Sequence, residues 1–69
     1  MTQSQKILNY MKTYGSITPL DALREFGCMR LAARIFDLAH QGHQIETNVE
    51  TSVNRNGEKV SYARYKLIA

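Results

Sequence analysis

Apolar side chains recur at helical spacing near the start of the chain. Four of them fall at offsets 0, 1, 4 and 7, which places them on one face of a helix from about residue 2 to 14. These are Ile7, Leu8, Met11 and Tyr14. Gly15 then ends the helix, because glycine readily adopts the left-handed conformation that closes many helices. Ser16 and Ile17 follow, and they are too few to form more than a single extended step.

The sequence Thr18-Pro19-Leu20-Asp21 predicts the start of a second helix. Thr18 can cap it, and Asp21 can reach back to complete a capping box. Pro19 suits the first helical position, because its missing N–H would be unpaired there. Gly27 ends this helix after about two turns. We expect its buried side to consist of Leu20, Leu23 and Phe26.

A third helix is predicted over residues 28–41, closed by Gly42. Leu31, Ile35 and Leu38 stand at i, i+4 and i+7 and form its buried stripe. Only Gly27 and its neighbours separate this helix from the preceding one, so the chain must turn there for both apolar stripes to reach the first helix. Two short helices joined in this way form a helix-turn-helix arrangement.

After Gly42 the period changes to 2, which predicts a β-hairpin over residues 44–67. A two-residue Asn56-Gly57 turn would put the apolar residues of the two strands on opposite faces. A three-residue loop, 55–57, with Gly57 left-handed beside a bulge, puts them on one buried face, and we predict this register. Its pairs are Ile45 with Leu67, Thr47 with Tyr65, and Val49 with Ala63.

This order of elements is that of a winged helix-turn-helix, an α+β fold with three helices followed by a two-stranded β-hairpin wing. The run ITPLDALREFGCMRLAARIFDLAHQGHQI, with the later strand YARYKL, resembles small winged-helix proteins common in bacteriophages and prophages. The resemblance extends from about Ile7 to Leu67 and implies a DNA-binding regulator of transcription or excision. Winged helices also dock proteins, so a phage inhibitor of a host protein that does not bind DNA is the alternative.

Length and composition limit the classes of function that we expect for this chain. The 69 residues suffice for one domain, 1–69, and leave little volume for a substrate cavity, so we expect neither an enzyme nor a small-molecule substrate. The net charge of +3 permits a polyanionic partner. One cysteine, a polar N-terminus and the lack of a long apolar run favour a cytoplasmic, nucleoid-associated protein that does not enter a membrane.

The predicted third helix offers a candidate surface for the major groove of double-stranded DNA. If its aliphatic stripe faces inward, Arg30 points outward and Arg34 lies on the shoulder, and arginine can bind guanine bidentately. Ala33 is small enough to let the helix approach the bases. Asp37 could accept from cytosine, or it could pair with Arg34 three residues earlier. The full candidate set on this helix is Met29, Arg30, Ala33, Arg34 and Asp37.

The predicted hairpin offers a second candidate surface, for the phosphate backbone. Arg55, Asn56, Lys59 and Arg64 lie on it or at its tip, although basic residues also occur on edge strands to prevent strand pairing. Thr18, at the start of the second helix, could bind a phosphate or serve only as a cap.

No cofactor is implied by the remaining residues. Cys28, His40 and His43 lack a fourth ligand at the spacing of a structural zinc site. A module this small contacts few base pairs, so we expect a homodimer or a cooperative array on DNA.

Overall fold

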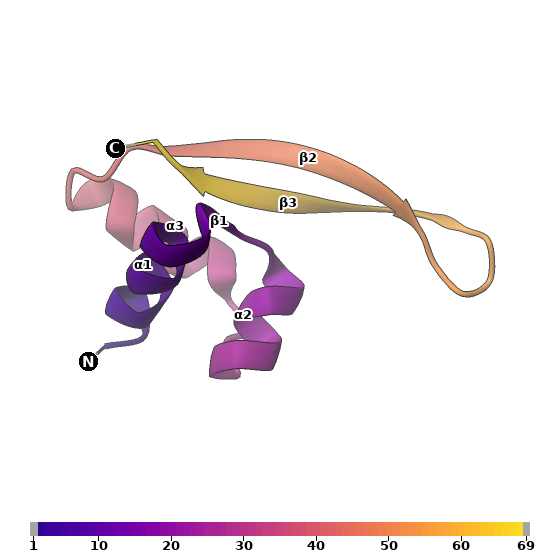
Figure 1. Cartoon of the computed structure of the whole chain (residues 1–69), viewed down its shortest axis with the longest axis horizontal. Coiled ribbons are helices and arrows are strands. Elements are labelled where there is room, and N and C mark those ends of the chain that lie inside the picture. The colour runs from indigo at the N-terminus through magenta and orange to yellow at the C-terminus, as the bar shows by residue number, and fades with distance from the viewer. Residues whose placement is uncertain (1, 69) are drawn as a thin grey trace.

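The computed structural model describes residues 2–68 and has an α+β architecture. In chain order its elements are α1 (Gln3–Tyr14), β1 (Ser16–Ile17), α2 (Pro19–Phe26), α3 (Leu31–His40), β2 (Ile45–Val53) and β3 (Lys59–Leu67). The three helices lie together on one side, and the β2–β3 hairpin extends well beyond them as a long arm (Figure 1). The principal extents of 39, 22 and 20 Å reflect this arm.

The predicted helix boundaries at Thr18 and Gly27 are confirmed. The Thr18 hydroxyl accepts a hydrogen bond from the Asp21 amide at 3.2 Å, and the Asp21 carboxylate accepts one from the Thr18 amide at 3.1 Å. This reciprocal capping box satisfies amides that the first helical turn leaves unpaired. Gly27 ends α2 at φ +63°, a conformation that disfavours side chains with a Cβ.

The core lies where the helices meet the base of the sheet. Ile35 and Leu38 of α3 are buried there, as the sequence predicts, against Ile7 and Met11 of α1. The remaining buried core residues are Ile17, Ala22, Cys28 and Leu31. Ile45, Tyr65 and Leu67 of the hairpin pack against this cluster only in part. The helices therefore hold most of the buried apolar surface, and the hairpin is anchored at its base.

The segment Ser16–Ile17 does more than the sequence predicts. It forms strand β1 and pairs with β3, Ser16 opposite Lys66 and Ile17 opposite Tyr65. The result is a three-stranded antiparallel sheet in the order β1-β3-β2, instead of the expected two-stranded hairpin. Two residues are enough here because the partner strand is already in place and Ile17 is fully buried.

The predicted hairpin register is confirmed, with Ile45 opposite Leu67 and Val49 opposite Ala63. The loop is the three-residue 55–57 loop. The Asn54 amide donates to the Glu58 carbonyl at 2.9 Å, and the Gly57 amide donates to the Asn54 carbonyl at 3.0 Å. Gly57 is left-handed at φ +80°, as this loop requires.

Three expectations about burial are wrong. Leu20 and Leu23 of α2 are 64% and 47% exposed, and Ala22 is the buried residue of this helix. Tyr14, the last residue of α1, is 70% exposed, and its ring lies against that of half-buried Tyr10, with 4.5 Å between the ring centroids. Val49 is 77% exposed despite the correct register, because the hairpin packs against the core only at its base, through Ile45, Tyr65 and Leu67.

Candidate nucleic-acid interface

The turn between α2 and α3 is longer than the sequence predicts. The expected helix 28–41 begins at Leu31, so Met29 and Arg30 lie in the turn and not on the helix. Cys28 is buried in the core, and its amide donates to the Ala22 carbonyl at 3.1 Å. This contact fixes the turn and leaves Met29 86% exposed. Arg30 occupies the cap of α3, and its side chain makes no capping bond.

The outer face of α3 is mainly apolar. Phe36 is 63% exposed and lies against the ring of His40, with 4.2 Å between the ring centroids. Ala32 and Ala39 are also exposed, and Ala33 is half-buried. Phe36 follows buried Ile35 by one residue, which turns it about 100° away from Ile35 around the helix.

Arg34 is less available than the sequence suggests. Its Nη1 lies 3.4 Å from the Asp37 carboxylate, which is the intrahelical ion pair that the sequence left open as an alternative role for Asp37. The Arg34 Nε is buried and has no hydrogen-bond partner. Only 33% of the Arg34 side chain is exposed. Arg34 therefore lies along the helix and does not extend away from it.

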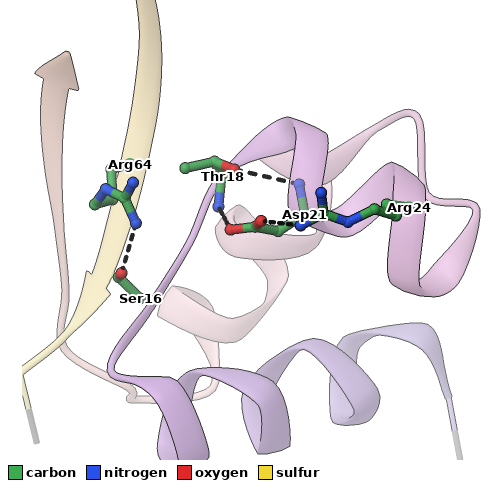
Figure 2. A network of polar contacts seen from close by, with 5 residues as sticks. All are labelled: Ser16, Thr18, Asp21, Arg24 and Arg64. Atoms are coloured by element: carbon green, nitrogen blue, oxygen red, sulfur yellow. Dashed lines mark hydrogen bonds and ion pairs between the residues drawn. The ribbon is translucent and has the colours of Figure 1, made fainter.

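Arg64 connects three strands at the base of the hairpin. Its Nε lies 2.9 Å from the Glu50 carboxylate on β2, and its Nη1 donates to the Ser16 hydroxyl on β1 at 3.0 Å (Figure 2 shows the latter contact). Hydrogen bonds from Arg64 and Tyr62 hold the pKa of Glu50 below its ordinary value, and the Glu50 hydrogen bond raises the pKa of Arg64. Arg64 thus binds neighbouring strands.

The hairpin tip carries free positive charge. Arg55, Asn56 and Lys59 are all exposed, and neither cation forms an ion pair within residues 2–68. The Asn54 side chain accepts hydrogen bonds from the Asn56 and Glu58 amides at 3.0 Å each, which fixes the loop. The tip lies at the far end of the arm, away from the helices (Figure 1). It can therefore reach a surface that the helices do not touch.

Thr18 is engaged within the protein. Its hydroxyl and amide both take part in the capping box with Asp21, and Asp21 also pairs with Arg24 at 3.2 Å (Figure 2). Thr18 is only 6% exposed. The geometry corresponds to the simple cap that the sequence left open as an alternative to phosphate binding.

A groove of about 730 Å³ lies between α2, the turn and the hairpin. Its walls are largely apolar, and sequence reasoning missed it because Leu20 and Leu23 were assigned to the core. Met29 and Val60 face it from the turn and from β3.

These features form one pattern: a three-helix body, a glycine turn before α3, and a hairpin with a basic tip that extends beyond the helices. The protein-family model for the winged helix-turn-helix domain matches residues 2–69. The chain belongs to this family. No curated protein and no solved structure matches the chain in the corresponding searches.

As a winged helix-turn-helix domain, the chain has α3 as the second helix of its helix-turn-helix and the β2–β3 hairpin as its wing. Membership of this family suggests that the partner is DNA, and domains of this family are typically non-enzymatic. Within residues 2–68, no helix has the length and apolar character needed to cross a membrane, and no cluster of metal-binding side chains occurs.

Proposed function

We propose that this winged-helix domain is a non-enzymatic regulator that binds double-stranded DNA and controls phage or prophage transcription or excision. Helix α3 enters the major groove, which accepts a single α-helix, and the wing lies along the backbone or in the adjacent minor groove. A cytoplasmic, nucleoid-associated location follows from such a partner. The observation that carries this proposal is the distribution of unpaired cations.

Ion pairing divides the charged residues into two sets. Three of the nine basic residues, Arg24, Arg34 and Arg64, pair with three of the six acidic ones. Six basic residues remain without an ion pair in the described chain, and four of them lie on the turn or the wing. These four are Arg30, Arg55, Lys59 and Lys66. Two acidic residues without an ion pair, Glu46 and Glu58, also lie on the wing, so the turn and wing keep a net unpaired charge of +4 − 2 = +2, which favours contact with a phosphate backbone.

The candidate residues then take different roles. Arg30, at the start of α3, is the arginine placed to reach a base edge or a nearby phosphate. Ala33 keeps the helix close to the groove. Arg55 and Lys59, with Asn56 between them, contact phosphates at the wing. Arg64 acts indirectly, because its contacts within the sheet set the direction of the wing.

A single module of this size buries roughly 600 to 1,000 Å² on DNA, which is small for specific binding. We therefore expect a homodimer on paired half-sites or a cooperative array along the duplex. Sedimentation of the protein with duplexes of increasing length distinguishes the two, because an array adds protein copies in proportion to duplex length.

Binding to a library of random duplexes at two ionic strengths tests the proposed function. If about four phosphates are neutralised, log K falls with log salt at a slope of roughly −3.6. Enrichment of a sequence motif would further support a regulatory site. A slope indistinguishable from zero would exclude the groove-and-wing mode of binding.

The apolar groove favours a second candidate function, a protein-docking module. Leu20, Leu23 and Met29 are exposed there and could bind an apolar segment of a host protein. Charge reversal by Arg30→Glu with Arg55→Glu should abolish retention on DNA, whereas Leu23→Asp should not. The opposite pattern, with DNA retention unaffected by charge reversal, would favour the docking function.

A further inference from the structure

The outer face of α3 lacks the residues that read guanine. Its exposed positions hold Phe36, His40 and alanines, and its one arginine, Arg34, lies along the helix towards Asp37. Met29, 86% exposed in the turn, lies just ahead of the same helix. A helix with this surface would make mainly apolar contacts in a major groove.

One base in the major groove matches such a surface. Among the four standard bases, only thymine carries a methyl group on its major-groove edge, at C5, and phenylalanine and alanine are suited to contact that methyl. The Phe36 ring is 63% exposed and is supported on one side by the ring of His40 at 4.2 Å. Much of its apolar surface is thus free to be buried against a methyl group.

We propose that α3 selects its site through thymine methyl groups, with Phe36 as the specificity-determining residue. This inference rests on the proposed function, because it requires α3 to lie in the major groove. Phe36 contacts the C5-methyl of a thymine, and Ala32 extends the apolar contact along the helix. Arg30 and the wing supply attraction to the backbone, which carries no sequence information.

Charge favours DNA over a second copy of the chain on this face. The face is bordered by Arg30, which has no ion pair, while its one acidic neighbour, Asp37, already pairs with Arg34. In a symmetric dimer the same patch is present twice, so the interface would hold two unpaired Arg30 cations with no unpaired carboxylate from either patch to match them. DNA, a polyanion, would instead bring negatively charged phosphates next to Arg30.

The experiment replaces thymine by deoxyuridine, one position at a time, in a duplex selected from the random library. This change removes only the methyl group. We expect one or two positions at which affinity falls about fourfold, the effect of losing one buried methyl. Phe36→Ala should bind the thymine and deoxyuridine duplexes equally at those positions, and Phe36→Leu should retain part of the difference.

Tyr14→Ala is the matched control, because Tyr14 is an equally exposed aromatic residue on α1 that also lies against a neighbouring ring. It should keep the full sensitivity to the methyl group. Uniform binding to every deoxyuridine duplex by the wild-type protein would overturn the inference, while the salt-dependent binding would still support the proposed function. Equal methyl sensitivity in Phe36→Ala and wild type would also overturn it, as would a Phe36→Ala effect confined to self-association. Failure to bind any duplex at low salt would instead overturn the proposed function.

Discussion

Removing the two cations of the wing tip should change how strongly salt weakens DNA binding. Arg55 and Lys59 are two of the four unpaired cations on the turn and wing. Each cation that neutralises a phosphate contributes about 0.9 to the slope of log K against log salt. The double variant Arg55→Ala with Lys59→Ala should therefore move the slope from roughly −3.6 to roughly −1.8. Between 50 and 200 mM salt, the loss of affinity should shrink from roughly 150-fold to roughly 12-fold.

Fluorescence anisotropy with a labelled duplex at four or more salt concentrations measures both slopes. The control is Lys6→Ala with Lys12→Ala, which removes two exposed cations from α1 and gives the same net charge, +3 − 2 = +1. If placement of charge matters, the control keeps the wild-type slope. Equal slopes for the two double variants would refute the reasoning, because net charge alone would then account for the salt effect.

Three further predictions concern stability. Leu38→Ala, at a position 1% exposed, should lower the free energy of unfolding by about 2 to 5 kcal/mol, measured by urea denaturation. Gly27→Ala should cost about 1 to 2 kcal/mol in the same assay although its Cβ would meet no atom within 4 Å, because φ is +63°. Stability should fall as pH drops through the lowered pKa of Glu50, since protonation ends its pairing with Arg64. In thermal melts, Glu50→Gln should lose less melting temperature at acidic pH than the wild-type protein. An equal loss in both proteins would contradict this prediction.

Local chemistry made the helix ends and the hairpin loop predictable from sequence. The capping box at Thr18 depends on residues three positions apart, and it forms as expected. Gly57 fits the left-handed position of the three-residue loop, and the loop in turn fixes the register of both strands. The buried stripe of α3 was predictable because its three residues follow helical spacing. They are Leu31, Ile35 and Leu38, and all three are buried.

Long-range contacts decided what the sequence did not reveal. Strand β1 exists because β3 lies beside Ser16 and Ile17, and no local pattern in two residues predicts that pairing. Helix α2 has only two turns, so Ala22 is its one buried residue and Phe26 packs against the core in part, while Leu20 faces the groove instead. Arg30 falls outside α3 because the turn extends further past Gly27 than the spacing of apolar residues indicated.

The short strand β1 connects the wing to the helix-turn-helix. Ser16 binds Arg64 of β3, and two residues later Thr18 caps α2, so the wing and the helix-turn-helix are held by one continuous segment. Arg64 also binds Glu50, which joins β2 to the same point. Under the proposed function, an arginine on a phosphate would contribute to the salt dependence of binding. An arginine inside the sheet would instead set the direction of the wing relative to the helix. Arg64 is placed for the second task, so its importance for DNA binding would be in the affinity at every salt concentration and not in the slope.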